Sequence, residues 1–123
     1  MKQSKLDKLQ EHDVLPGNNL TVSEKLQIAL DMAKSIADIH GFKEGLIVHA
    51  VIHTDQWLLS PNGTVKLNDF GDSYQAPWNE KMQWYCFSTH LSQSGTWRSP
   101  KEYQGLGLQT KAVDVYTFGN LIL

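Results

Sequence analysis

The sequence Val-Lys-Leu-Asn-Asp-Phe-Gly at residues 65–71 decides the fold of this chain. Its first three residues form a short run that is typical of a β-strand. The apolar pair Leu58-Leu59 precedes it, and Asn62-Gly63 lies in the turn between the two runs. Because Asn-Gly supports the positive φ angles of a tight turn, this pattern predicts a β-hairpin. The hairpin places an Asp-Phe-Gly tripeptide directly after its second strand.

A helix is predicted over residues 22–40, upstream of the hairpin. Thr21 and Glu24 have the spacing of a capping box, in which each side chain accepts a hydrogen bond from the other residue's backbone N–H. Gly41 stands just past the expected end, where glycine is favoured. An apolar face recurs at helical spacing. We expect it to contain Leu26, Ala29, Met32 or Ala33, Ile36 and Ala37.

The remaining elements are harder to delimit. Residues 46–48 predict a strand before the hairpin, and residues 4–10 are compatible with a short helix that residues 15–19 connect to the longer one. Residues 70–99 show no sustained period, which predicts a long functional or mobile loop. Strongly apolar residues between 113 and 122 predict a final helix that reaches the end of the chain without a cap, so this helix looks cut rather than finished.

The composition excludes several classes of function. The chain has 11 Lys and Arg against 13 Asp and Glu, with a formal net charge of -2. Its basic residues are scattered, so nucleic acid is not expected as a partner. The single cysteine, Cys86, cannot form an internal disulfide, and no apolar run approaches the roughly 18 residues of a membrane span. We therefore expect an intracellular, cytoplasmic protein with no membrane segment in this chain.

Four motifs, in order, resemble the C-terminal lobe of protein kinases. Residues 49–59 have the length of the family's catalytic loop, and residues 65–71 resemble its metal-binding strand and turn. Residues 95–103 resemble the end of its activation segment, and residues 114–119 resemble the start of its buried central helix. A lone Asp-Phe-Gly is a weak signal, whereas four motifs in the family's order make a strong one. The resemblance covers residues 20–123.

This resemblance implies ATP and Mg²⁺ as cofactors and a set of catalytic residues. At the family's catalytic aspartate this chain has Val51, which cannot accept a proton, so general-base help is lost there. At the asparagine that binds a second metal it has Gln56, whose amide oxygen lies one methylene further out. Asp69 is retained as the implied Mg²⁺ ligand. With Phe70 and Gly71 it makes the turn that resembles the family's cofactor-binding turn.

A second register exists for the catalytic pair. His53-Thr54-Asp55 also has a histidine and an aspartate two positions apart, which makes Asp55 a candidate displaced base. Val51 and Asp69 keep the family's spacing, whereas a start at Asp55 leaves that spacing too short. Because positioning dominates phosphoryl transfer, Val51 is the better match to the catalytic position.

Other residues have structural roles by resemblance. His49 is implied to be a packed, backbone-bonded loop histidine, and Asp114 to brace the catalytic-loop backbone from the central helix. Thr96 lies at the end of the activation segment, where Lys101 replaces the family's glutamate. The adjacent Glu102 could substitute for that glutamate after a small backbone shift. Its distant arginine partner would lie beyond the end of this chain.

Two further positions depart from the family's pattern. The catalytic-loop arginine, which would hold an activation-loop phosphate by bidentate hydrogen bonds, is Ala50, so control through that contact is in question. His53 stands where the family usually has a lysine that steadies the transferred phosphate. A neutral imidazole would do this less well than an ammonium group.

These observations predict an α+β, mainly helical fold: a protein-kinase-like C-terminal-lobe fragment with a small β-hairpin, without the N-terminal lobe and the last helices. Residues 1–20 are expected to be a linker or short helix, and residues 20–123 a partial protein kinase domain. The glycine-rich loop, strand lysine and helix glutamate of the family's ATP site are absent from these residues. We therefore expect the chain itself to be inactive and marginally stable.

Three functions remain open from the sequence. The first is a degenerate kinase, or pseudokinase, that acts as a scaffold or allosteric partner of another protein. The second is a segment of an active kinase that phosphorylates a protein substrate, with the remaining domain missing from this chain. The third is a small metal-binding domain, whose candidate ligands are His49, His53 and Asp55, or Cys86 and His90. Neither set reaches a persuasive ligand number, so the kinase hypotheses are favoured.

Overall fold

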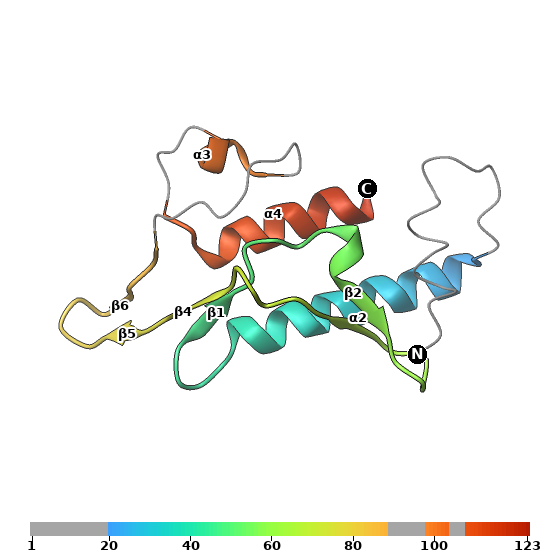
Figure 1. Ribbon diagram of the computed structural model, residues 1–123, viewed down its shortest axis with the longest axis horizontal. Coiled ribbons are helices and arrows are strands. Elements are labelled where there is room, and N and C mark those ends of the chain that lie inside the picture. The colour runs from blue at the N-terminus through green and yellow to red at the C-terminus, as the bar shows by residue number, and fades with distance from the viewer. Residues whose placement is uncertain (1–19, 89–97, 104–107) are drawn as a thin grey trace.

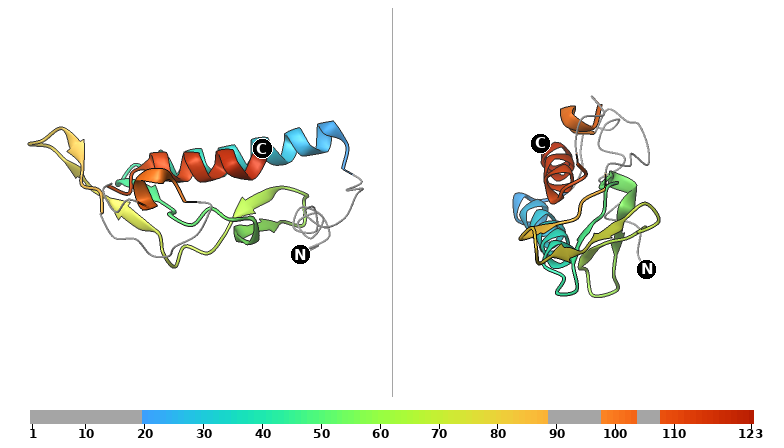
Figure 2. Two further views of the ribbon diagram at one scale, coloured as in Figure 1. Left: turned by 90° about the horizontal axis from the view of Figure 1, so that it is seen from above. Right: turned by 90° about the vertical axis from the view of Figure 1, so that its left-hand side faces the viewer.

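The computed structural model describes residues 20–88, 98–103 and 108–123. In chain order, this part contains α2 (Val22–His40), β1 (Leu46–Val48), the 3₁₀ turn η2 (Thr54–Gln56), β2 (Trp57–Leu59), β3 (Val65–Leu67), β4 (Tyr74–Ala76), β5 (Trp78–Asn79), β6 (Trp84–Tyr85), α3 (Pro100–Tyr103) and α4 (Lys111–Ile122). The two long helices lie side by side (Figure 1). In Figure 2, left, they form one layer, and strands β2 and β3, in green, lie below it.

Helix α2 confirms the predicted boundaries and capping box. The Glu24 N–H donates to Thr21 Oγ1 at 3.1 Å, and the Thr21 N–H donates to Glu24 Oε2 at 2.8 Å. At the other end, the Gly41 N–H donates to the Ala37 carbonyl at 2.9 Å. Orphan backbone groups at both ends of the helix therefore have partners within its own local sequence, which is why the sequence predicted this element well.

The predicted buried face of α2 was partly wrong. The buried residues are Ile28, Met32 and Ile36, which lie four positions apart on one side of the helix. Leu26 is 66% exposed. Because each residue turns the helix by about 100°, Leu26 points roughly 200° away from Ile28. Apolar residues occur at helical spacing both on the predicted face and on the face of Ile28, Met32 and Ile36. Only the packing against the strands determines that the latter face is buried.

The predicted hairpin is formed by β2 and β3. Trp57 pairs with Leu67 and Leu59 with Val65, so the two strands are antiparallel and in register. In the turn, the Asn62 side chain accepts a hydrogen bond from the Thr64 N–H at 3.1 Å. Gly63 has a φ of 86°, which glycine adopts without steric cost.

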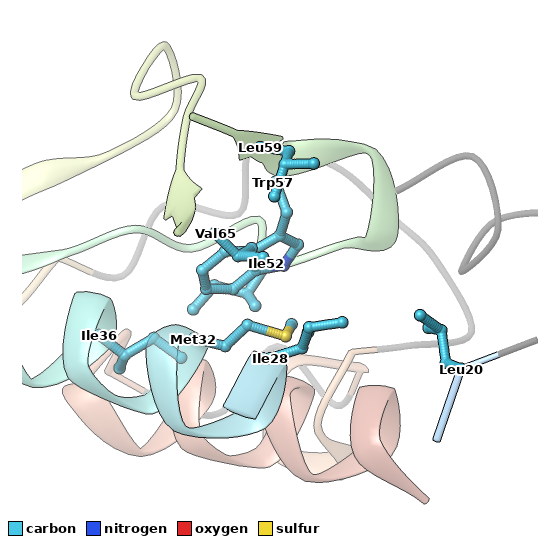
Figure 3. Packing of buried hydrophobic residues seen from close by; sticks show 8 residues of the cluster. All are labelled: Leu20, Ile28, Met32, Ile36, Ile52, Trp57, Leu59 and Val65. Atoms are coloured by element: carbon cyan, nitrogen blue, oxygen red, sulfur yellow. The ribbon is translucent and has the colours of Figure 1, made fainter. Parts of the chain in front are cut away.

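The main core lies between α2 and this hairpin. Figure 3 shows side chains of the helix and the hairpin pointing toward one another. This cluster consists of Leu20, Ile28, Met32, Ile36, Ile52, Trp57, Leu59 and Val65. A second cluster, around β1, β4 and the start of α4, consists of Leu46, Val48, Ala50, Ala76 and Val113. The loop of residues 49–51 therefore lies between the two cores.

The interpretation of residues 70–99 as one long loop was wrong for residues 74–85. Strand β4 pairs antiparallel with β1, with Leu46 opposite Ala76. Strands β5 and β6 form a second hairpin, which projects from one end of the molecule (Figure 1). Each of these strands has only two or three residues, too few to display a period of two in the sequence. The short helix α3 was not predicted either.

Several predictions fall on residues outside the described part of the chain. These are the short helix at residues 4–10, its connection at residues 15–19, and the positions of His90 and Thr96.

Replacing Met32 by alanine tests the main core. Met32 is 3% exposed in the cluster, whereas Leu30, on the same helix, is 48% exposed. We expect Met32→Ala to lower the free energy of unfolding by about 3 kcal/mol, because it leaves a cavity in a packed core. Leu30→Ala should change it by less than about 0.5 kcal/mol. Urea unfolding followed by tryptophan fluorescence measures both variants, and equal effects would contradict this assignment of the buried face.

Candidate functional site

The site is built around the carboxylate of Asp114 in α4, which is 1% exposed. Its Oδ2 accepts a hydrogen bond from the His49 N–H at 2.9 Å, and its Oδ1 accepts one from the Ala50 N–H at 2.9 Å. His40, at the end of α2, places Nε2 2.8 Å from the same Oδ2. One side chain thus connects both long helices to the loop of residues 49–51.

The loop histidine has a partner at each ring nitrogen. His49 Nε2 lies 2.8 Å from the Asn68 carbonyl, and the Val51 N–H donates to His49 Nδ1 at 3.3 Å. A carbonyl can only accept and an N–H can only donate, so this arrangement requires the proton on Nε2. The ring is fully buried and meets the Phe70 ring edge-on, with centroids 5.0 Å apart.

Val51 itself follows a residue in an unusual backbone conformation. Ala50 has a φ of 69°, in the left-handed region that residues with a Cβ rarely adopt. The Val51 side chain is 8% exposed and apolar. At the position that resembles the family's catalytic aspartate, the structure therefore holds a buried group with no proton acceptor.

The Asp-Phe-Gly turn follows β3. Asp69 has a φ of 57°, and its exposed carboxylate accepts only a long hydrogen bond, from the Gly71 N–H at 3.3 Å, among the contacts of the described residues. A side chain at Gly71 would place its Cβ 3.2 Å from Asp69 Oδ1, so glycine leaves room for that carboxylate. Ser73 donates through both its N–H and its hydroxyl to the Phe70 carbonyl, at 3.1 and 2.7 Å.

The hairpin brings Gln56 close to this turn along the backbone. The Asn68 N–H donates to the Gln56 carbonyl at 2.7 Å, so Gln56 is paired with the residue that precedes Asp69. The Gln56 Nε2 lies 3.3 Å from Asp55 Oδ1, which leaves the amide oxygen on the other branch of the side chain. Carboxylate and amide oxygens are ligands that Mg²⁺ accepts, so Asp69 and Gln56 fit a magnesium site chemically.

His53 and Asp55 form an exposed pair beside the loop. His53 Nδ1 lies 2.9 Å from Asp55 Oδ1, and their side chains are 44% and 61% exposed. The pair is therefore well solvated, unlike the buried loop that carries Val51. The contact orients the imidazole and occupies one carboxylate oxygen of Asp55.

Two residues of the site were not recognised from the sequence. The Arg98 guanidinium is 2% exposed, and its Nη1 lies 2.8 Å from Glu102 Oε1 and 2.7 Å from the Ala50 carbonyl. The arginine partner of Glu102 was predicted to lie beyond the end of this chain, whereas in the structure Glu102 forms an ion pair with Arg98. Their four-residue spacing was a usable sequence signal for a local pair. His40 carried no such signal, because its partner Asp114 is remote in the sequence.

Among the described residues, no three His, Cys, Asp or Glu side chains come together in a way that could hold a metal ion. The metal-binding hypothesis thus finds no support in that part of the chain. Within the same residues, no helix is both long enough and apolar enough to cross a membrane.

Comparison with known proteins identifies the family of this chain. A family model described as protein tyrosine and serine/threonine kinase matches residues 1–123. The chain belongs to this protein kinase family. Among the curated Arabidopsis thaliana relatives, Wall-associated receptor kinase 5 is 30% identical over 112 residues, which cover 91% of this chain and 15% of the relative. The probable serine/threonine-protein kinase PBL17 is 35% identical over 107 residues, which cover 87% of this chain and 23% of the relative.

A third relative, Calmodulin-binding receptor-like cytoplasmic kinase 1 of Arabidopsis thaliana, is 31% identical over 116 residues. The match covers 94% of this chain and 24% of that protein. The chain thus spans less than a quarter of the length of these curated relatives. The match corresponds to one segment of each of these relatives.

The Asp114 carboxylate can be tested by an isosteric change. Asp114→Asn replaces one oxygen by an amino group, which cannot accept from the N–H groups that now face the carboxylate. We expect the free energy of unfolding to fall by about 3 kcal/mol, as for the loss of a buried, charged acceptor. The exposed Asp38→Asn is the control and should be nearly neutral. An Asp114→Asn variant with unchanged urea unfolding would contradict the importance of this carboxylate.

Tyr74 in β4 lies close enough to this carboxylate to respond to its charge. Burial raises the pKa of Tyr74 to about 12, the Ser88 backbone opposes that rise, and the charge of Asp114 adds to it. The folded protein therefore keeps the phenolic proton at pH values where the unfolded chain has lost it. Between pH 10 and 12 the unfolded state binds fewer protons, so the free energy of unfolding falls as pH rises.

Tyr74→Phe should remove this contribution. We expect the free energy of unfolding of the unmodified protein to fall more steeply between pH 10 and 12 than that of the variant. All other residues are the same in the two proteins, so the difference between the two pH profiles reports the contribution of Tyr74. Urea unfolding at a series of pH values measures the difference, and parallel pH profiles would show that Tyr74 does not titrate in this way.

Proposed function

We propose that this chain is the central part of the C-terminal lobe of a protein kinase domain that has lost efficient phosphoryl transfer and acts as a scaffold or allosteric partner of another protein. The observation that carries the proposal is Val51, a buried valine in a loop whose backbone N–H groups are bound by Asp114 and His49. Residues 20–123 form the domain segment in this proposal, and residues 1–20 precede it as a linker or short helix.

The chemical reason lies in the side chain at position 51. A catalytic base accepts the proton of the attacking hydroxyl and contributes about a hundredfold to ten-thousandfold to the rate. Valine has no lone pair for this role, and its side chain is buried. The loop backbone is held by Asp114, a contact that does not involve the side chain at position 51. Loss of the base is therefore compatible with retention of the fold.

ATP and Mg²⁺ are part of the proposal as cofactors of the whole domain. Asp69 and Gln56 are the residues that would hold the metal, with Phe70 and Gly71 shaping the turn. A bound Mg²⁺ ion neutralises phosphate charge during transfer. In this chain the exposed Asp69 carboxylate is weakly engaged, since its hydrogen bond from Gly71 is 3.3 Å long, and is thus accessible to a cation.

An active kinase is the second candidate function. Asp55 supports it, because an exposed carboxylate beside His53 could serve as a displaced base. The hydrogen bond from His53 competes for that carboxylate, and the loop places Asp55 four positions after Val51, so we rank this candidate second. For either candidate we propose an intracellular protein, in agreement with the receptor-like cytoplasmic kinases among its relatives.

Restoring the carboxylate in the intact protein tests the proposal. We expect the unmodified protein to transfer radiolabelled phosphate from Mg-ATP to a generic substrate no faster than its Asp69→Ala variant. Val51→Asp should raise the rate by about a hundredfold or more, because it returns a base to the loop. Val51→Asn is the matched control, since it adds a polar group of similar shape without a basic carboxylate, and should give no gain.

The two candidates give different results in this assay. Phosphate transfer by the unmodified protein, abolished by Asp69→Ala and by Asp55→Asn, would replace the pseudokinase proposal by the active-kinase one. Thermal unfolding of each variant establishes that it is folded before its rate is compared.

A further inference from the structure

Arg98 is a buried cation. Its guanidinium and the Glu102 carboxylate are 2% and 4% exposed, with Nη1 and Oε1 2.8 Å apart. Burying a charge without a partner is strongly unfavourable, so each of these groups depends on the other. An exposed arginine would be solvated and would place little constraint on its neighbours. A buried arginine with a buried partner holds the segments around it in a defined arrangement.

The carboxylate of Glu102 has further donors around it. Its Oε2 accepts a hydrogen bond from the Ser99 N–H at 2.7 Å, at the start of α3. Its Oε1 also lies 3.4 Å from Gln109 Nε2, just before α4. Glu102 therefore ties together the residues on both sides of α3.

Arg98 extends this contact to the loop that carries Val51. The same Nη1 that meets Glu102 donates to the Ala50 carbonyl at 2.7 Å. On its other side, the Ala50 N–H donates to Asp114 at 2.9 Å. Both peptide groups that flank the left-handed Ala50 are thus held, one from α4 and one from Arg98. A strained backbone conformation persists only where the surroundings hold it in this way.

We propose that Arg98 is a positioning residue, which holds the loop of residues 49–51 through the Ala50 carbonyl and couples it to α3 through Glu102. We name these three residues, Ala50, Arg98 and Glu102, the Arg98 network. Its cation is already matched by a buried carboxylate, so the loop is ordered without a phosphate group on the protein. This inference goes beyond the proposed function, because it does not depend on nucleotide binding or on catalysis.

Backbone amide hydrogen exchange in the full chain tests the network. The double variant Arg98→Met/Glu102→Met replaces the ion pair by apolar groups of similar length, which a buried site often tolerates. We expect the Ala50 and Val51 amides to exchange at least tenfold faster, while the amides in the middle of α2 are unchanged. Lys34→Met/Asp38→Met changes two exposed residues with the same spacing and should have no effect on the loop.

Faster exchange confined to α3, with the loop unaffected, would overturn the proposal, because the pair would then be only a local contact of α3. If the double variant does not fold, the single variant Arg98→Lys tests the proposal in the same exchange experiment. Lysine keeps the charge opposite Glu102 but lacks the planar fork of donors. We expect it to raise exchange at Ala50 and Val51 severalfold, and exchange equal to that of the unmodified protein would contradict the role of the guanidinium.

The independence from phosphate has its own test. Protein produced in bacteria, with a mass that shows no phosphate, should already protect the Ala50 and Val51 amides. Protection that appears only after the protein has been phosphorylated would contradict the proposal.

Discussion

The rest of the structure depends on the Asp114 carboxylate. Burying an ionised carboxylate is unfavourable by several kcal/mol unless its lone pairs are occupied. Here the backbone N–H groups of His49 and Ala50 and the ring of His40 occupy them. Helix α4 cannot shift relative to α2 or to the loop without leaving this charge unsatisfied. The carboxylate therefore sets the positions of both long helices and of the loop of residues 49–51.

Because this constraint acts on backbone groups, the fold and the chemistry of the site are separable. The N–H groups that Asp114 binds are present whatever the side chains of the loop are, and the carbonyl that Arg98 binds is equally independent of sequence. The side chain at position 51 can thus vary without disturbing these backbone contacts. The Asp-Phe-Gly turn is held separately, by the β2–β3 hairpin and by the contact of Phe70 with His49. These contacts to the backbone do not depend on whether the loop carries a catalytic base.

The Arg98 network gives a physical account of two other departures from the family's pattern. Ala50 has no guanidinium to bind a phosphate, and Lys101 cannot serve as the acidic partner of a distant arginine. Arg98 and Glu102 supply a cation and an anion within one short segment, and both are buried. The hydrogen bond from Arg98 to the Ala50 carbonyl joins this segment to the loop of residues 49–51. In our proposal, this network orders the loop without a phosphate group on the protein.

The sequence by itself determined the elements whose partners are close along the chain. The capping box of α2 and the Asn62-Gly63 turn depend on residues a few positions apart, and the identity of Val51 needs no structure at all. Tertiary packing alone decided which face of α2 is buried, the pairing of β4 with β1, and the contact of Arg98 with Ala50, whose residues are 48 positions apart. Local patterns cannot specify such contacts, because their free energy arises only when remote segments exclude water from the same volume.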